Sequence, residues 1–379
     1  MNRRGLLLAT SALAAGGIRV ALAKEAGSAS NVVKFGLSAS LTGGQAAYGA
    51  DIRDGILAAF AAAGRLNSDS APRCELLTLD DGGDREKCKA NVKSLIGSGV
   101  TALLGLTSGA AAEACLPMIE EAQVVLLGTA SGNMGVRSEK LAMAYQVRAG
   151  YDSEYRQMVR YVKEFGFDRI GYVHLQDTSA ANQAAMTAAL EAVGVKLTLS
   201  VPLDRNAKSY AAEADTLLKA NLNCVLFTTN AAPAEQIIGR MAAAKYPGTY
   251  FSSSFAGQAL INGMAGKGIS IIMSQVVPRP NASALVVVKR CRDDLAALGG
   301  NAKIGYTTLE GYIAGRVAVE AATRAAQGGG SVSRARFKSA LSDLNLDLGG
   351  YRVQFAGGSK QGSKLVDIVA IDRTGRIIG

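Results

Sequence analysis

The chain has 379 residues, and its 41 Lys and Arg exceed its 31 Asp and Glu to give a formal net charge of +10. At about 100–200 residues per domain, this length predicts two domains, each large enough to bury a core, which excludes disorder as the main state. With 44 Gly, 7 Pro and no three-residue period, the composition also excludes a collagen-like or proline-rich assembly. Only 19% of the residues are charged, and the basic ones are spread along the chain. This distribution disfavours a nucleic-acid partner.

The first residues have the pattern of an export signal. Arg3 and Arg4 precede an apolar stretch at 6–18 that is too short to span a bilayer, and Ala21-Leu22-Ala23 is a small-x-small cleavage signature. We therefore predict a signal peptide at residues 1–23, cleaved after Ala23, and a periplasmic mature protein. An uncleaved anchor is the alternative, which Arg19 disfavours. The paired arginines loosely resemble a twin-arginine signal, so the twin-arginine and Sec routes both stay open.

From residue 32 onward, short apolar runs alternate with amphipathic segments. The runs predict strands at 32–38, 74–79, 100–104 and 124–127, with helices at 51–63, after Asp84 and after Ser108. Strands that are apolar throughout are buried on both faces, and helices between them imply right-handed crossovers in a parallel sheet. Residues 31–149 are therefore expected to form one α/β lobe.

A second series of the same kind follows residue 149. It predicts helices at 152–165, 181–193, 211–220 and 233–244, and strands at 169–175, 195–201, 224–228, 249–253 and 269–276. Such a series indicates a second α/β lobe.

The pattern changes past Pro278. Helices are predicted at 284–298, 307–326 and 333–341 with hardly any strand between them, and strands follow at 351–355 and 365–371. Helices without strands of their own need a sheet to cover. We therefore assign 31–149 plus 278–349 to lobe 1 and 150–277 plus 350–379 to lobe 2, so that the chain crosses between lobes three times. In such folds, ligands bind outside the carboxyl ends of the strands, in the gap between the two sheets.

Polar and small residues follow the predicted strands of both lobes. The turn at Thr107 and Ser108 opens a helix, whose free N–H groups suit a carboxylate. Each residue also has a simpler interpretation as a helix cap or an ordinary turn. The residues predicted to line the gap are Ser40, Tyr48, Thr107, Ser108, Ala130, Ser131, Gly132, Tyr151, Asp152, Ser179, Asn230 and Ser254.

Catalytic chemistry finds little support in the sequence. His174 is the sole His and lies within an apolar strand, where a hydrogen-bonded core residue is the favoured interpretation. The five Cys have no Cys-x-x-Cys spacing, and there is no Gly-x-Ser-x-Gly elbow. Gly43 and Gly44 lack the remainder of a phosphate-binding motif. We predict no enzyme activity, no metal and no cofactor.

Cysteine usage in an exported protein favours at least one disulfide. Cys88 and Cys115 lie on successive predicted helices that should share one face of the sheet. We predict a disulfide between them, with two buried free thiols as the alternative.

Four segments resemble a known family: Gly36–Gly43, Tyr48-Gly49, Leu79–Gly82 and Tyr306–Tyr312. They are similar to those of the periplasmic solute-binding proteins of branched-chain amino acid type ABC transporters, the leucine/isoleucine/valine-binding protein family. The resemblance covers essentially the whole mature chain. It implies the type I periplasmic binding protein fold, in which two doubly wound α/β lobes are joined by a three-crossover hinge.

The resemblance also implies roles for individual residues. In the family, the turn corresponding to Thr107 and Ser108 and the loop corresponding to 130–132 hold the carboxylate and the amine of an amino acid. This chain departs from the leucine-binding members at four positions. Those members usually have Thr near Gly132, Tyr near Ser179, Tyr near Asn230 and Glu near Ser254. Without that Glu an ammonium group loses a partner, so a small carboxylate, amide or aromatic acid competes with an α-amino acid.

The function implied is that of a monomeric "Venus flytrap" that captures a small amino acid or related carboxylate and delivers it to a membrane permease. The alternative is a periplasmic sensor that presents its ligand-bound form to a signalling receptor.

Overall fold

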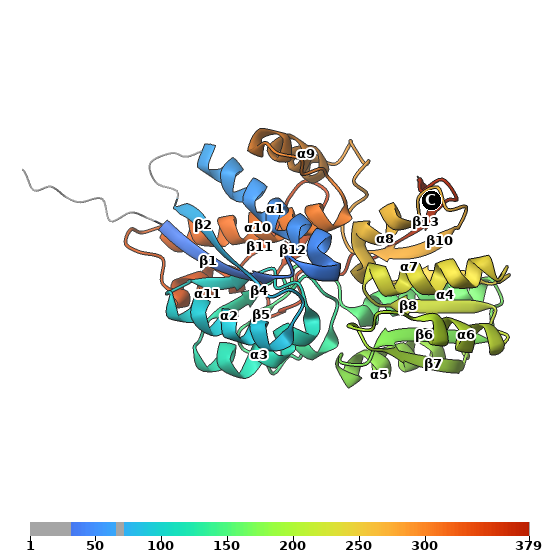
Figure 1. The fold of residues 1–379 in the computed structure, drawn as a ribbon. Helices are drawn as coiled ribbons and strands as arrows, with labels where there is room; N and C mark the ends of the chain where they lie inside the picture. Colours follow the sequence, from blue (N-terminus) through green and yellow to red (C-terminus); the bar gives the residue numbers. More distant parts are fainter. Residues whose placement is uncertain (1–31, 66–71, 379) are drawn as a thin grey trace, which may run out of the picture. The chain divides into compact units, whose positions relative to one another are not determined.

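The computed structural model describes residues 32–65 and 72–378. The predicted signal peptide and its cleavage site lie outside the described residues. Two β-sheets, each covered by helices, organise the described part of the chain (Figure 1). No helix within the described residues has both the length and the apolar character needed to cross a membrane.

The first sheet has five parallel strands in the order β2-β1-β3-β4-β5. Residues of β3 and β4 are apolar and buried without exception, because helices cover both faces of the sheet. The strands are β1 (Val32–Ala39), β2 (Arg73–Asp80), β3 (Ala102–Leu104), β4 (Val125–Leu127) and β5 (Ala144–Tyr145).

Helices from two distant parts of the chain pack on the first sheet. α10 packs along α1, α9 also packs on α1, and α11 packs on α10. The helices that follow Pro278 therefore lie with the first lobe (Figure 1). The helical segments are α1 (Ala46–Arg65), α2 (Arg85–Gly97), α3 (Gly109–Glu121), α9 (Val286–Leu298), α10 (Tyr306–Ala326) and α11 (Arg334–Ser342), with the short 3-10 turns η1 (Gly43–Gln45) and η2 (Met134–Val136).

The second sheet has seven strands in the order β14-β13-β10-β9-β8-β6-β7. Strands β6 to β10 run parallel, and β13 pairs antiparallel with β10. Its strands are β6 (Ile170–Leu175), β7 (Leu197–Leu203), β8 (Cys224–Thr228), β9 (Thr249–Ser252), β10 (Ile271–Gln275), β13 (Asp367–Ile371) and β14 (Ile377–Ile378), and its helical segments are α4 (Tyr151–Glu164), α5 (Ala180–Glu191), α6 (Ala211–Lys219), α7 (Ala231–Ala243), η3 (Ser254–Ala256) and α8 (Gly257–Met264).

Strand order reverses once in each sheet. β1 lies between β2 and β3, and β6 lies between β7 and β8. The chain thus winds in both directions from β1 and from β6, which confirms the prediction of two doubly wound α/β lobes. At such a switch point the turns after two neighbouring strands open away from each other and leave room for a ligand.

The strand predicted at 351–355 does not join the second sheet. It forms β12 (Arg352–Gln354), which pairs antiparallel with β11 (Asn345–Asp347). A tight turn explains this pairing: Gly349 and Gly350 take positive φ angles of 87° and 100°, and Asp347 Oδ1 accepts a hydrogen bond of 2.7 Å from Gly349 N. Because the turn reverses the chain, β12 pairs with β11, which directly precedes it in the sequence.

The third crossing between the lobes therefore lies later than the predicted position near Gly349. Gly362 N donates to Gln146 O at 2.7 Å, so the chain still runs beside the end of the first sheet at that point. It enters the second sheet only at β13. The other lobe boundaries stay predictions.

Candidate functional site

Turns after β1 and β3 meet at the switch point of the first sheet. Ser40 N donates to Thr107 Oγ1 at 3.1 Å, which joins the two turns. Ser108 is the N-cap of α3 and accepts a hydrogen bond of 3.3 Å from Ala111 N. The first amide groups of a helix have no partner within the helix. The amides of Gly109 and Ala110, next to Ser108, are the first two of α3.

The loop after β4 is fixed by two tyrosines. Tyr48 donates its hydroxyl to Ala130 O at 2.7 Å. Ser131 Oγ lies 3.2 Å from the hydroxyl of Tyr151, and Gly132 O accepts 2.8 Å from Tyr151 N. A Cβ atom on Gly132 would lie 2.3 Å from the Tyr151 ring, so only glycine allows this close approach. The loop is thereby locked against the start of α4.

A buried ion cluster lies where the chain crosses between lobes. Arg148 pairs with Glu154, and its Nη1 lies 3.3 Å from Glu310 Oε1. Ser254 N donates to Glu154 Oε2 at 2.8 Å, and Ser274 Oγ donates to the same oxygen at 2.6 Å. Burial opposes the charge of Arg148, but Glu310 and Glu154 outweigh that effect and raise its pKa. The cluster joins the segment before α4 to α4, β10 and α10.

Between the lobes lies a small cavity of about 10 Å³. It has room for about one water molecule. A second cavity of about 180 Å³ lies next to it, and Arg205 lines both. The first cavity is lined by Gly109, Ala110, Ser131, Asn133, Tyr151, Thr178, Asn182, Arg205, Thr228 and Phe255.

Segments that follow β3, β6 and β7, together with the end of β8, contribute to this lining. Gly109 and Ala110 follow β3, Thr178 follows β6, and Thr228 ends β8. Arg205 comes two residues after β7. The cavity is therefore built where doubly wound sheets are expected to hold a ligand.

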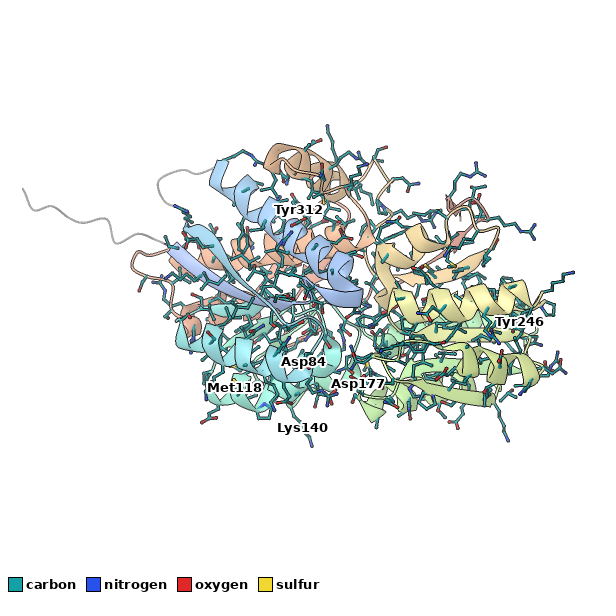
Figure 2. The ribbon with its side chains drawn as sticks, viewed as in Figure 1. Asp84, Met118, Lys140, Asp177, Tyr246 and Tyr312 are labelled. Atoms are coloured by element: carbon teal, nitrogen blue, oxygen red, sulfur yellow. The ribbon has the colours of Figure 1, made fainter. Side chains whose placement is uncertain are left out.

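Contacts between the lobes surround the cavity. Arg85 Nη2 donates to Asp177 O at 2.8 Å, and Met134 N donates to Asn182 Oδ1 at 2.8 Å. Figure 2 shows Asp177 at the place where the lobes meet, beside Asp84 at the start of α2. Tyr48 of the first lobe packs edge-on against Phe255 of the second, with ring centroids 5.8 Å apart.

Of the predicted binding residues, three line a cavity directly. Ser131 and Tyr151 line the smaller one, and Asn230 lines the larger one. The side chain of Ser108 is used as a helix cap, although its neighbours Gly109 and Ala110 line the cavity. The residues that support the lining from behind, through the contacts given above, are Ser40, Tyr48, Thr107, Ala130 and Gly132.

Three predicted residues have other partners. Asp152 forms an ion pair with Arg156 at 3.0 Å. Ser179 caps α5 by accepting from Ala181 N at 3.4 Å. Ser254 belongs to the buried ion cluster, where it accepts from Arg148 Nη2 at 2.7 Å.

Sequence reasoning missed Arg148, Glu154, Glu310 and Arg205. Arg148 stands between apolar residues just after β5, and such a charge inside an apolar run signals a buried ion pair. Glu310 lies within the segment Tyr306–Tyr312, which was noted for its resemblance only. Arg205 follows a strand end like the predicted residues, but nothing in the sequence set it apart from other arginines.

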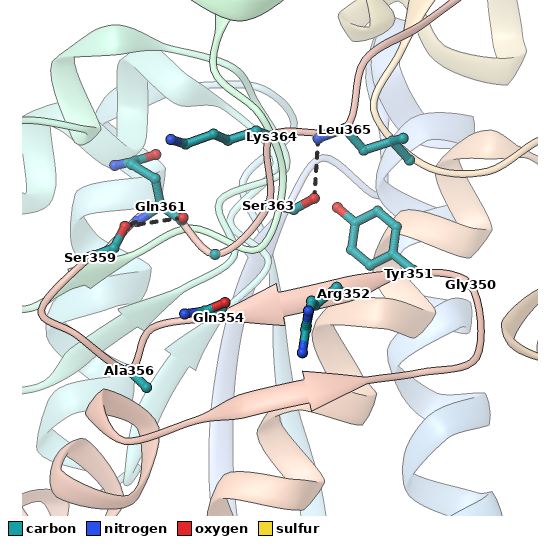
Figure 3. A pocket seen from close by; sticks show the side chains of 11 residues that line it. Gly350, Tyr351, Arg352, Gln354, Ala356, Ser359, Gln361, Ser363, Lys364 and Leu365 are labelled. Atoms are coloured by element: carbon teal, nitrogen blue, oxygen red, sulfur yellow. Dashed lines mark hydrogen bonds between the residues drawn. The ribbon is translucent and has the colours of Figure 1, made fainter.

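A larger hollow lies along the segment between β12 and β13 (Figure 3). Its volume is about 540 Å³, and a single stretch of chain, 350–365, supplies its whole lining. Some polar groups of that stretch form hydrogen bonds with one another, since Leu365 N donates to Ser363 Oγ at 3.3 Å. A site made by one segment does not couple binding to contact between lobes, so we do not assign the solute site there.

All five cysteines are free thiols in the structure. Cys88 and Cys115 are buried neighbours on α2 and α3, as their spacing predicted, but the predicted disulfide is absent. The neighbouring Cys115 thiol and burial together raise the pKa of Cys88.

His174 is buried in β6. Its Nδ1 lies 3.1 Å from Leu175 O, and its Nε2 lies 3.1 Å from Ser200 Oγ. Burial lowers its pKa. Within residues 32–65 and 72–378, no three His, Cys, Asp or Glu side chains gather as a metal site would require.

A family model described as periplasmic binding protein matches residues 32–376. No curated protein matches the chain. Among solved structures, the chain is similar to a possible leucine/isoleucine/valine-binding protein from Rhodopirellula baltica, with 24% identity over 92% of this chain and 97% of that one and a TM-score of 0.84. It is also similar to a leucine binding protein from Thermotoga maritima, with 17% identity over 91% and 97% and a TM-score of 0.78.

A third similar structure is a solute binding protein of an ABC transporter from R. palustris in complex with 4-hydroxybenzoate. The identity is 16% over 91% of this chain and 95% of that one, and the TM-score is 0.76. At identities this low, the structural similarity shows that the chains share a fold. Because the family model covers nearly all of the described residues, the chain belongs to the periplasmic binding protein family.

Proposed function

We propose that the protein is the solute-binding component of an ABC importer, which captures a small carboxylate between its lobes and delivers it to a membrane permease. The observation that carries the proposal is the pair of neighbouring cavities, of about 10 Å³ and about 180 Å³, which share Arg205 and are both lined by polar groups of the two lobes. A solute bound there contacts both lobes only when they are together. Its binding free energy therefore shifts the population toward that state.

The start of α3 is the proposed docking point for the carboxylate. α3 has 13 residues, and its first turn lines the cavity through Gly109 and Ala110. Helix N-termini carry a partial positive charge and free N–H groups, both of which favour an anion. Ser131 and Tyr151 supply hydroxyl groups on the same wall.

An acid without an amine is favoured over an α-amino acid. No Asp or Glu is among the described residues that line either cavity. Two acids at the start of α4 are already paired, Asp152 with Arg156 and Glu154 with Arg148. An ammonium group would therefore be buried without a carboxylate partner, at a cost of several kcal/mol.

Ligands named for similar structures agree with an acid at the level of chemical class. Leucine and 4-hydroxybenzoate, which are named for two of them, both carry a carboxylate. They share little else, so the carboxylate end is the part that the proposal takes from them.

Native mass spectrometry of the protein purified from its own periplasm tests the proposal. We expect one small acid per chain, released on unfolding and identified from its mass. The unfolded and refolded protein, free of solute, should bind the same compound in a calorimeter. A tightly bound solute without any carboxylate would contradict the proposal.

A further inference from the structure

Arg205 places a buried guanidinium group at the cavity, and one of its nitrogen atoms has no partner in the part of the chain that the structure describes. Of the described residues that line the two neighbouring cavities, Arg205 alone carries a charge, and it lines both. Its side chain is only 9% exposed. Its Nη1 atom is buried and has no hydrogen-bond partner among the described residues. Since buried N–H groups are normally paired, this one is left for an acceptor that the protein does not supply.

The contacts of Arg205 fix which edge of its guanidinium remains free. Asp177 accepts from Nε and from Nη2, each at 2.7 Å, so the carboxylate occupies one edge of the planar group. Nη1 lies away from that edge. Arg85 Nη2 also lies 3.7 Å from Asp177 Oδ2, so two arginines share one carboxylate. The remaining charge of +1 favours an anion.

The neighbours of Arg205 in the lining extend this donor surface. Asn182 Oδ1 accepts a hydrogen bond from Met134 N, which fixes the orientation of the side-chain amide. The Nδ2 atom of the same amide has no hydrogen-bond partner among the described residues. Thr228 Oγ1 is likewise buried without a partner among the described residues. Both residues line the smaller cavity together with Arg205. Three of the residues that line the smaller cavity from the second lobe thus each have one polar atom that is unpaired within the described part of the chain.

We propose that the solute carries a second acidic group and that Arg205, with Asn182 and Thr228, binds it while the first carboxylate docks at the start of α3. The protein is then a receptor for a small dicarboxylate. This inference rests on the proposed function and names its substrate class. It also gives each lobe one acidic group to hold, so that a molecule with a single carboxylate contacts the second lobe less strongly.

Titration calorimetry with matched acids tests the inference on the wild-type protein. The pairs are butanoate and succinate, pentanoate and glutarate, and 4-methylbenzoate and terephthalate, which have equal carbon numbers and differ in the second carboxylate. We expect at least one diacid to bind tenfold or more tightly than its partner. This comparison does not depend on the folding of any variant.

Variants then locate the preference. Arg205→Gln should weaken the binding of that diacid roughly tenfold to a hundredfold and leave its monoacid partner within about twofold. Arg205→Lys, which keeps the charge and loses the planar fork, should weaken it less. Arg240→Gln is the control, because Arg240 makes the same two-bond contact with Asp215 on the exposed surface of the same lobe. It should change neither affinity.

Two outcomes would overturn the inference in different ways. Equal affinities within every pair, or an equal loss of both acids in Arg205→Gln, would remove the second acidic group and leave the proposed function standing. A wild-type protein that binds no acid of either kind would contradict the proposed function as well.

Discussion

Ser108 is the N-cap of α3 and lies next to the proposed site. Its hydroxyl caps α3 by accepting from Ala111 N, and the two residues after it line the cavity. Ser108→Ala should therefore have two separable effects. Loss of the cap should lower the free energy of unfolding by about 1 kcal/mol. Loss of the cap should also loosen the first turn of α3, whose Gly109 and Ala110 line the cavity, and so weaken the binding of the identified acid about tenfold.

Ser333 offers a matched control for that prediction. It caps α11 by accepting from Arg336 N at 3.2 Å and does not line either cavity. Ser333→Ala should cost similar stability in urea unfolding and leave the affinity unchanged. An unchanged affinity in Ser108→Ala would mean that the carboxylate docks elsewhere.

Asp51 makes stability depend on pH. Burial, and then the nearby Asp54, raise its pKa from 3.8 to about 6 in the folded protein. Below pH 3.8 the folded and unfolded states both hold the proton. Between pH 3.8 and about 6 only the folded state keeps it, so the free energy of unfolding falls as the pH rises, by at most about 3 kcal/mol.

Asp51→Asn removes this titration and keeps the shape of the side chain. We expect the variant to be more stable than the wild type in urea at pH 8, and the difference to shrink as the pH falls toward 4. A difference that is the same at both pH values would show that Asp51 is charged at no cost in the folded state.

The packing of α1 on α10 depends on glycines in both helices. A Cβ atom on Gly55 would lie 2.1 Å from Thr308 O and 2.6 Å from Tyr312 N. On α10, a Cβ on Gly311 would lie 2.3 Å from Ile52 O. Both sites face backbone atoms of the other helix, which cannot rotate away. The two helices approach closely because glycine has no side chain at these contact positions.

Gly55→Ala should therefore destabilise the protein by at least about 1–3 kcal/mol, the usual cost of overpacking. Gly64→Ala in the same helix is the control, because no described atom lies within 4 Å of its Cβ position. There, alanine should raise stability by roughly 0.5–1 kcal/mol through its higher helix propensity. Thermal unfolding of both variants measures the contrast, and equal shifts would contradict close packing at Gly55.

Most helices and strands could be predicted from the sequence, because apolar runs and capping residues mark them locally. Asp84 and Ser108 cap α2 and α3 as expected. β5 has two residues and β11 has three, which is too short for a periodic signal. The strand at 352–354 was predicted, but its partner was wrong because the turn at 347–350 supplied a nearer one.

The candidate site was harder to predict for a different reason. Strand order decides which turns meet, and a single sequence does not state that order. Ser131, Tyr151 and Asn230 line the cavities, whereas Asp152 and Ser179 satisfy their own helix. Whether a polar residue at a strand end faces a ligand or caps a helix depends on contacts from the opposite lobe.

At the scale of the whole molecule, the buried ion cluster and the cavity lie at the same junction between lobes. Glu154 and Glu310 come from helices of different lobes and both pair with Arg148. Removal of one member of such a buried cluster leaves an unpaired charge and costs about 3–5 kcal/mol. The crossing segments are thus strongly tied together, whereas the outer contacts between lobes are exposed and weaker. Movement of the lobes is expected to break the outer contacts first.

Arg85 provides the means to test this movement. It donates to Asp177 O across the lobes, and its side chain is 43% exposed. Exposed pairs contribute about 0.2–1 kcal/mol, so Arg85→Ala should weaken solute binding by at most about fivefold. Lys89→Ala is the control, since Lys89 pairs with Glu86 within α2.

Small-angle scattering should show a smaller radius of gyration for the wild type at saturating solute. Arg85→Ala should reach the same radius at a higher solute concentration. Without this contact, the state with the lobes together is less stable relative to the state with the lobes apart, so more solute is needed to populate it. Lys89→Ala should follow the wild-type curve. A radius that does not change at saturating solute would contradict the coupling of binding to lobe movement. A shared midpoint for all three proteins would show that the contact between Arg85 and Asp177 plays no part in holding the lobes together.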